Sequence, residues 1–389
     1  MKETRFKDTE IGRIPEEWEV KVLGKVCDTT SGGTPARSNP AYYEGNIPWI
    51  TTSELKDGHI YDSKEHITIS AIAASSAKLL PESTLLMAMY GATIGKLGIT
   101  TLPLTTNQAC CAILPKEDNI KYLFYKLLAD RANLISKGCG AGQPNISQTI
   151  IKELKYSFPG KVEQSRIAAA LTSVDDLISA LDKLIEKKKN IKQGSMQLLL
   201  TGKKRLKGFT DPWVEKKMGT IEIQNGAMLN STEYKAGNIP VIAGGKQPAG
   251  YHSSSNRLAN TITISASGAN AGYISFYKGP IFASDCSTIN EQKGISIEFL
   301  YYCLLLRQNA IYKCQTGGAQ PHIHAKDIKD IGFAMPSDIS EQKRIASIIE
   351  SMDDEISSLE AKKAKYEQVK QGMMQQLLTG KIRLIEEPA

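Results

Sequence analysis

Apolar residues recur at alternating spacings of four and three positions in two separate stretches of the chain. In the first stretch the stripe consists of Ile167, Leu171, Val174, Ile178, Leu181 and Ile185. In the second it consists of Ile345, Ile349, Met352, Ile356 and Leu359, and it resumes at Tyr366, Met373 and Leu377. This period is typical of helices that pack along a narrow seam. The pattern therefore predicts two long helices, each about 60 Å long if it spans roughly forty residues.

The two predicted helices are copies of one sequence. Residues 163–206 align with residues 341–384, and 24 of the 44 aligned positions are identical. Each copy ends in Leu-Leu-Thr-Gly-Lys, in which Gly202 and Gly380 suit the left-handed residue that commonly ends a helix. A duplication of this length indicates that the whole chain consists of two related halves.

The segments before the two helices also repeat, more weakly. Three short motifs recur, and their positions are 45–48 and 237–240, 91–95 and 268–272, and 143–146 and 320–323. Trp18 and Trp213 stand near the start of the two halves. The sequence therefore predicts a globular domain at 1–160, a long helix at 161–208, a second domain at 209–338 and a second long helix at 339–389.

Each predicted domain mixes strand-like runs with one helical run. Apolar runs such as 85–88 and 261–264 alternate with turns rich in Gly, Ser and Asn, and an amphipathic helix is expected at about 120–132 and 297–310. We therefore predict a mixed α/β (α+β) fold for each domain. If the two long helices pack antiparallel as a coiled coil, the chain forms a pseudo-two-fold dumbbell. Two-fold proteins match two half-sites a fixed distance apart on DNA, and here the half-sites would differ because the domains differ.

Composition and charge narrow the class of protein. The net charge of +7 over 389 residues is compatible with a polyanionic partner without proving one. Neither a signal peptide nor an apolar run long enough to cross a membrane is recognisable. Seven cysteines form no framework spacing, which favours reduced thiols and a cytoplasmic location.

Several short motifs could carry chemistry, and each has a simpler interpretation. Residues 39–42 (Asn-Pro-Ala-Tyr) approach the Asn-Pro-Pro-aromatic signature that grips a flipped base in amino-methyltransferases, but Ala41 replaces the second proline and a turn is favoured. Gly202-Lys203 lacks the rest of a phosphate-binding loop, so a helix end is favoured there. His322 and His324 have no further His or Cys at ligand spacing. We therefore predict no catalytic residue and no metal site.

Paired carboxylates recur in both helices. Asp175-Asp176 and Asp353-Asp354 occupy equivalent places in the two copies. Such pairs on a helix surface are usually solvated, but their recurrence is also compatible with docking of a partner. Both interpretations stay open at this stage.

Basic, amide and aromatic side chains in or beside turns are the candidates for contacts to DNA. Arg and Lys read guanine, and Asn and Gln read adenine, through paired hydrogen bonds in the major groove. Gln143 and Gln320 also fit a structural role because they match between the domains. The candidates are Arg37, Tyr42, Tyr90, Lys96, Asn107 and Gln143 in the first domain, and Asn230, Lys246, Gln247, Asn270, Lys278 and Gln320 in the second.

The duplicated helices carry Glu-Gln, Arg-Ile-Ala, Asp-Asp and Leu-Leu-Thr-Gly-Lys in the same order, and Ser-Gly-Gly-Thr-Pro stands at 31–35. With these motifs the chain resembles, over essentially its whole length, the specificity subunit of type I restriction-modification enzymes. The resemblance implies two target recognition domains, each of which reads one half of a split, asymmetric target in double-stranded DNA. It implies that the helices set the spacer and dock two methyltransferase subunits, and that motor-nuclease subunits join the complex.

The same resemblance implies a non-catalytic subunit that binds no cofactor, because S-adenosylmethionine, ATP and Mg are handled by the partner subunits. Two alternatives stay open from the sequence. One is a self-sufficient DNA methyltransferase or nuclease, which needs a complete donor pocket or a metal-carboxylate site. The other is a coiled-coil scaffold whose heads bind carbohydrate or protein rather than DNA.

Overall fold

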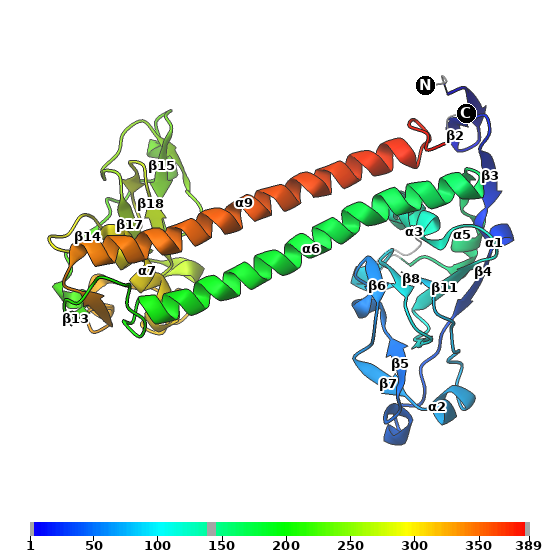
Figure 1. Cartoon of the computed structure of the whole chain (residues 1–389), viewed down its shortest axis with the longest axis horizontal. Coiled ribbons are helices and arrows are strands. Elements are labelled where there is room, and N and C mark those ends of the chain that lie inside the picture. Colours follow the sequence, from blue (N-terminus) through cyan, green and yellow to red (C-terminus); the bar gives the residue numbers. More distant parts are fainter. Residues whose placement is uncertain (1–3, 138–144, 386–389) are drawn as a thin grey trace. The chain divides into compact units, whose positions relative to one another are not determined.

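The computed structural model describes residues 4–137 and 145–385. The chain divides into two compact units, residues 1–180 with 362–389 and residues 181–361. Each unit holds one globular domain and one part of each long helix, α6 (Lys161–Leu199) and α9 (Ile339–Leu377), as the labels in Figure 1 allow the reader to follow. The mixed α/β fold and the two long helices predicted from the sequence are confirmed, whereas the coiled coil and the dumbbell stay predictions.

The first domain is built on a five-stranded sheet in the order β4-β11-β8-β9-β6 and a three-stranded sheet in the order β10-β5-β7, with the two-stranded ribbons β12-β3 and β1-β2. Its strands are β1 (Phe6–Thr9), β2 (Gly12–Pro15), β3 (Glu19–Val22), β4 (Cys27–Ser31), β5 (Ile47–Ile50), β6 (Gly58–Ile60), β7 (Glu65–Ile67), β8 (Leu85–Ala88), β9 (Leu97–Thr100), β10 (Thr105–Thr106), β11 (Cys110–Pro115) and β12 (Lys155–Phe158). Its helices are α1 (Leu23–Val26), α2 (Ile69–Ala73), α3 (Ile120–Ala129), α4 (Arg131–Ser136) and α5 (Gln148–Glu153).

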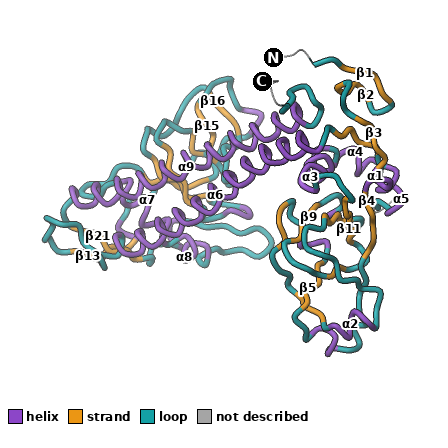
Figure 2. The backbone as a smooth tube through the Cα atoms, turned by 45° about the vertical axis from the view of Figure 1, so that its right-hand side comes forward, coloured by secondary structure: helices purple, strands orange, loops and turns teal. Residues whose placement is uncertain are grey.

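The second domain contains a four-stranded sheet in the order β14-β20-β17-β18, a three-stranded sheet in the order β16-β15-β19 and the ribbon β13-β21. Its strands are β13 (Trp213–Lys217), β14 (Gln224–Asn225), β15 (Ile239–Ile242), β16 (Gly250–His252), β17 (Thr261–Ser265), β18 (Ile274–Tyr277), β19 (Phe282–Ala283), β20 (Cys286–Ile289) and β21 (Gly332–Pro336). Its helices are α7 (Ile297–Leu306) and α8 (Gln308–Tyr312). Figure 2 shows how strands and loops make up most of both domains, in contrast to the long helices.

The sheets of the two domains correspond strand by strand. The order β4-β11-β8-β9 in the first domain matches β14-β20-β17-β18 in the second, and the first domain adds β6, which pairs parallel with β9. In both three-stranded sheets the central strand has one parallel and one antiparallel neighbour. The weak repeat in the sequence therefore reflects one topology used twice.

The amphipathic helix predicted in each domain is broken after ten residues. The helix expected at about 120–132 ends at Ala129 and the chain turns at Asp130 before α4 begins. The helix expected at about 297–310 ends at Leu306, turns at Arg307 and continues as α8. Each break brings the first residue of a new short helix, Arg131 or Gln308, beside the neighbouring sheet.

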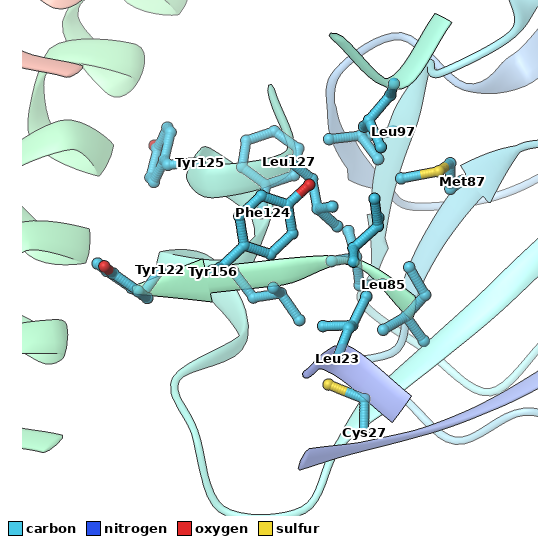
Figure 3. Close-up of a cluster of buried hydrophobic side chains, with 14 of the residues drawn as sticks. Leu23, Cys27, Leu85, Met87, Leu97, Tyr122, Phe124, Tyr125, Leu127 and Tyr156 are labelled. Carbon is cyan, nitrogen blue, oxygen red and sulfur yellow. The ribbon is translucent and has the colours of Figure 1, made fainter. Parts of the chain in front are cut away.

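The core of the first domain forms between α3 and the five-stranded sheet. Tyr122, Leu123 and Leu127 on α3 are fully buried, as are Leu85, Met87 and Leu97 on the sheet, and Figure 3 shows most of these side chains together. Burial of one such side chain contributes about 1.5–3 kcal/mol to stability. The apolar face of α3 therefore fixes the helix on β8 and β9, the two strands that carry the turn described below.

A buried carboxylate ties the start of each long helix to the end of the other. Glu163 lies in the first turn of α6, and Arg383 lies just after the end of α9. Glu163 accepts hydrogen bonds from Nε (2.8 Å) and Nη2 (2.9 Å) of Arg383. In the same way, Glu341 lies in the first turn of α9, and Arg205 lies just after the end of α6. Glu341 accepts hydrogen bonds from Nε (2.9 Å) and Nη2 (2.7 Å) of Arg205. Both glutamates are buried. Within each unit the two helix segments therefore run antiparallel.

The glutamine that follows each of these glutamates holds the helix to its domain. Gln164 Oε1 accepts the backbone N–H of Asn119 (2.9 Å), and Gln342 Oε1 accepts that of Ser296 (2.8 Å). Their amide groups donate to the backbone oxygens of Pro159 (3.0 Å) and Pro336 (2.9 Å). The recurrent Glu-Gln pair thus joins a helix, the tail of the other helix and a domain.

The first member of each Asp-Asp pair is engaged within its unit. Asp175 accepts a hydrogen bond from the Tyr125 hydroxyl (2.7 Å) and forms an ion pair with Lys370 (2.6 Å). Burial and the neighbouring carboxylate raise the pKa of Tyr125, so its hydroxyl stays a donor. Asp353 makes the same contacts with Tyr302 (3.1 Å) and Lys192. The interpretation of these two residues as merely solvated is wrong, because each carboxylate links a long helix to a domain and to the other long helix.

The hydrophobic stripe faces the interior of both units, but its residues are buried to different degrees. Its buried members are Ile167, Leu171, Leu181, Ile185, Ile345, Ile349, Ile356 and Leu377, and its partly exposed members are Val174, Ile178, Met352, Leu359, Tyr366 and Met373. The second member of each Asp-Asp pair, Asp176 or Asp354, is exposed. A docking role for those two stays a prediction.

Substitutions at Ile178 and Ile356 test whether the stripe residues are buried to different degrees. The two residues are a matched pair because they occupy equivalent positions in the repeat. Ile356 is 6% exposed, so Ile356→Asp places an unpaired charge in an apolar contact and should lower the free energy of unfolding by about 3 kcal/mol or more. Ile178→Asp should cost clearly less because Ile178 is half-buried. Urea unfolding of both variants measures the two losses. Equal losses, or none for Ile356→Asp, would contradict the packing of the stripe.

Candidate nucleic-acid interface

Each domain carries a short glycine turn between two neighbouring strands of its main sheet. We use this name for residues 91–95, between β8 and β9, and residues 268–272, between β17 and β18. Each turn contains one 3-10 turn of helix, at Gly91–Thr93 or Gly268–Asn270. The first and last glycines have φ of +72° and +74° in the first domain and +78° and +85° in the second. Such angles strain any residue with a Cβ, which explains why the glycines recur.

Backbone hydrogen bonds close both turns in the same way. The Gly95 N–H donates to the carbonyl of Ala88 (2.9 Å), and the Gly272 N–H donates to that of Ser265 (2.7 Å). The Ala88 and Ser265 N–H groups in turn donate to the carbonyls of Lys96 (2.9 Å) and Tyr273 (3.0 Å). The two turns therefore hold one backbone geometry.

A second segment of each domain lies across from the glycine turn. Tyr90 forms an isolated β-bridge with Asn145, and the Ile146 N–H donates to the carbonyl of Met89 (2.9 Å). In the second domain Ser267 bridges to His322, and the Ile323 N–H donates to the carbonyl of Ala266 (2.9 Å). We call residues 145–146 and 322–323 the facing segments. In the sequence, the Gln-Pro motif of the repeat directly precedes each of them.

Charged side chains clamp the glycine turn of the first domain. Arg131 Nε donates to the carbonyl of Gly95 (2.9 Å) and its guanidinium pairs with Asp57. Asp57 also accepts the Leu97 N–H (3.0 Å) and pairs with Lys96 Nζ (2.8 Å). Asp57 has φ of +62°, an uncommon conformation for a non-glycine residue. The carboxylate therefore collects two cations and a backbone N–H beside the turn.

Two neutral side chains, Gln308 and Gln315, clamp the glycine turn of the second domain. Gln315 Nε2 donates to the carbonyl of Ala271 (2.7 Å). Gln308 Nε2 donates to the carbonyl of Gly272 (2.7 Å), and its Oε1 accepts the Ile274 N–H (3.0 Å). Gln308 thus binds the two groups that Arg131 and Asp57 bind in the first domain. The sequence analysis missed all four residues because the residue types differ, and no recurrent motif marks them.

The contacts of Asp57 shift its titration. Burial of Asp57 acts to raise its pKa, but the hydrogen bonds from Lys96, the Leu97 N–H and Arg131 outweigh burial, so the pKa lies below the ordinary aspartate value. The carboxylate is therefore ionised at neutral pH and holds Lys96 and Arg131 beside the glycine turn.

Six of the predicted DNA-contacting residues lie at the glycine turns or beside them. Tyr90, 43% exposed, precedes the first turn and Lys96 follows it. Asn270 lies within the second turn, and Gln320 precedes its facing segment. Lys246 lies over the ring of Tyr273, with Nζ 5.4 Å from the ring centre, and Gln247 is its neighbour in the chain. Gln143 lies outside the described residues.

The other predicted residues lie elsewhere in the domains. Arg37 forms a two-pronged ion pair with Glu65 (2.8 and 2.7 Å) and lies over the ring of Tyr43, next to the predicted Tyr42. Lys278 pairs with Glu350 on α9 (2.6 Å). Asn107 Oδ1 accepts the Ala109 N–H (3.1 Å), and Asn230 begins a 3-10 turn. Contact with DNA stays a prediction for every candidate. Arg37, Lys278 and Lys96 already pair with carboxylates of the chain, so each would have to bind DNA in addition to its present partner or in place of it.

The motifs with simpler interpretations fold as turns and helix ends. Pro40–Tyr43 forms a 3-10 turn after Asn39, and Gly202 and Gly380 end their helices with φ of +69° and +70°. His324 begins the 3-10 turn Ala325–Asp327. In residues 4–137 and 145–385, no cluster of three His, Cys, Asp or Glu side chains could hold a metal ion. Over the same residues, no helix is long and apolar enough to cross a membrane.

The Asp57 clamp makes a pH-dependent prediction. The lowered pKa means that Asp57 contributes stability above the ordinary aspartate pKa of about 4, and that this contribution is lost as the pH falls through the lowered value. Asp57→Asn should therefore unfold at a lower temperature than the wild type at pH 7, and the difference should shrink at acidic pH. Thermal unfolding of both proteins from pH 7 to pH 3 measures it. A difference that stays constant, or grows, at low pH would contradict the clamp.

Comparison with known proteins places this geometry in one family. The family model described as "Type I restriction modification DNA specificity domain" matches residues 15–193 and 210–371, that is, both halves of the chain. The type I restriction enzyme MjaVIII specificity subunit of Methanocaldococcus jannaschii is 27% identical over 98% of this chain and 97% of its own length. The MjaIX specificity subunit of the same organism is 35% identical over 182 residues, a match that spans only 42% of that relative.

A solved structure shows the same fold. The crystal structure of the type I restriction-modification system S subunit from M. genitalium superposes with a TM-score of 0.69 at 18% identity, over 92% of this chain and 96% of that one. The match of the family model to both halves favours neither of the two alternatives left open by the sequence, a self-sufficient DNA methyltransferase or nuclease and a coiled-coil scaffold that does not bind DNA. The chain belongs to the family of type I restriction-modification DNA specificity proteins.

Proposed function

We propose that this chain is the specificity subunit of a type I restriction-modification complex and that each domain reads one half of a split, asymmetric DNA target. The observation that carries the proposal is that one frame, the glycine turn with its facing segment, occurs in both domains with different side chains. Tyr90 and Asn145 occupy the places that Ser267 and His322 occupy in the second domain. Equal frames with unequal side chains suit the recognition of two unequal half-sites.

The charges beside the frames support contact with a polyanion. Lys96 and Arg131 lie beside the first glycine turn and Lys246 beside the second. Lys and Arg that approach phosphates position a protein on DNA, whereas the side chains that reach base edges provide specificity. We infer that these three cations bind phosphates and leave base reading to their neighbours.

We infer further that the long helices set the spacer between the half-sites and dock two methyltransferase subunits. Gly194 and Gly372 occupy equivalent helix-interior positions, where glycine costs about 1 kcal/mol relative to alanine. Apart from its chain neighbours and the nearby backbone of its own helix, a Cβ built on either glycine meets no described atom within 4 Å, so packing against the rest of the chain does not account for them. Close approach of a partner chain would account for both at once.

Cavities beside the two glycines support the same inference. Gln371 and Met374 line one cavity of about 820 Å³ in the first unit, and the equivalent Gln193 and Met196 line one of about 410 Å³ in the second. Because identical residues recur at both places, the surfaces suit two copies of one partner. The exposed Asp176 and Asp354 lie on the same helices.

The chemistry of the complex is assigned to other subunits in this proposal. Methyl transfer from S-adenosylmethionine and ATP- and Mg-dependent cleavage would belong to the methyltransferase and motor-nuclease partners, and this subunit would bind no cofactor. The subunit would act where the chromosome is, in the cytoplasm. Its own contribution is the choice of the DNA sequence.

Domain exchange tests the proposal. Residues 209–338 are replaced by the equivalent domain of a relative, and the methylated bases are mapped genome-wide in cells that also express the methyltransferase. We expect the wild type to give a two-part target and the exchange to change only one part. Methylation that needs no two-part target, or an exchange that changes both parts, would contradict the proposal.

Alanine at the helix-interior glycines should separate stability from assembly. Gly194→Ala and Gly372→Ala should each raise the free energy of unfolding of the isolated subunit by about 0.5–1 kcal/mol, because alanine favours the helix. The same variants should bind the methyltransferase more weakly, as measured by titration calorimetry. Ala364→Gly in α9, at an exposed position, is the control, and it should destabilise the subunit without weakening the complex. Unchanged binding by both alanine variants would rule out these helix faces as the docking site.

A further inference from the structure

We propose that the residue pairs Tyr90 with Asn145 and Ser267 with His322 are the base-reading pairs of the two domains. This inference rests on the proposed function and goes beyond it, because it assigns half-site specificity to two positions in each domain. Three observations lead to these positions. The two domains share the same backbone arrangement at the pairs, a side chain holds the glycine turn at the same carbonyl in both, and the side chains of the pairs differ between the domains.

The equal backbone is the β-bridge itself. Tyr90 and Asn145 are bridge partners, as are Ser267 and His322, and beside each bridge a backbone N–H, of Ile146 or Ile323, donates to the backbone opposite. In the second domain the Gly268 N–H also donates to the carbonyl of Pro321 (2.9 Å). The two members of each pair therefore come from distant parts of the sequence and stand side by side. A pair of adjacent side chains on separate segments can address one base pair or two neighbouring ones.

The equal support is the clamp on the glycine turn. Arg131 and Gln308 reach the same carbonyl, of Gly95 or Gly272, although one is charged and the other neutral. Two different side chains thus produce one position for the turn. A base-reading side chain needs a backbone held in place in this way, because misplacement of about 1 Å forfeits a directional hydrogen bond.

The unequal chemistry lies at the paired positions. Tyrosine and asparagine stand in the first domain where serine and histidine stand in the second. Tyr90 is 43% exposed and Asn145 is also exposed, whereas the Ser267 hydroxyl donates to Asp285. The turns add only alanine at their exposed middle positions, Ala92 and Ala269, which leaves room for a groove edge to approach.

The chemistry of the first pair points to a class of base. The amide of Asn145 has the donor and acceptor that match N7 and N6 of adenine in the major groove, and the Tyr90 ring offers an apolar face to a neighbouring thymine methyl. The second pair lacks an amide, so its half-site should not share that preference. The geometry thus predicts an adenine read by Asn145 in the half-site of the first domain only.

The test moves the first pair into the second domain. Ser267→Tyr with His322→Asn is expressed with the methyltransferase, and methylated sites are mapped beside those of the wild type. We expect the second half-site to change its preference at one or more base pairs by roughly tenfold, the size of one good base contact. The first half-site should stay unchanged. Arg131→Gln is the control for support, and it should lower methylation of all sites without altering the preferred bases.

The outcomes separate this inference from the proposed function. A wild type without a two-part target defeats the proposed function. A wild type with a two-part target, together with a folded double variant of unaltered base preference, overturns the base-reading pairs alone. A change in the first half-site also overturns them. If the double variant unfolds at a lower temperature than the wild type and loses methylation, His322→Asn alone decides, by the same map and the same criterion.

Discussion

The fold depends on two ion pairs, one in each unit, whose glutamates are buried. Glu163 with Arg383 and Glu341 with Arg205 join the start of one long helix to the segment after the other. Removing one partner of such a pair leaves an uncompensated buried charge, which typically costs about 3–5 kcal/mol. Glycine at the helix end makes the pair possible, because Gly202 and Gly380 turn the chain so that an arginine three residues later faces the glutamate. The Glu-Gln motif that begins one copy of the repeat therefore makes its contact with the Leu-Leu-Thr-Gly-Lys segment, and its following arginine, that ends the other copy.

A second set of contacts fixes the register along the helices. Asp175 with Lys370 and Tyr125, and Asp353 with Lys192 and Tyr302, lie about three turns beyond the glutamates and bind the other helix and the domain together. A sliding helix would break both contacts at once. Each domain is thus attached at two points, and the glycine turn it carries has a fixed relation to its own pair of helix segments.

The sequence predicted the elements better than it predicted the contacts. The period of Ile345, Ile349 and Ile356 was enough to find α9, because a buried stripe repeats along a helix. The glycines of the two turns were found because a positive φ restricts the residue type. The clamps were not found, because Arg131 and Gln308 solve one geometric problem with different chemistry. Asp175 was ambiguous because its partner Lys370 lies far along the chain, and the contact of any candidate with DNA depends on a partner molecule.

The attachment of each domain through Gln164 or Gln342 has an evolutionary consequence. Each glutamine binds a backbone N–H at the start of a domain helix and a backbone carbonyl at the end of the last strand. Main-chain groups are the same whatever side chains a domain carries. A domain can therefore accumulate substitutions, or be replaced by gene recombination, without a change at this joint, as long as the tyrosine that binds Asp175 or Asp353 is kept. New target preferences can arise while the joint that holds the reader stays as it was.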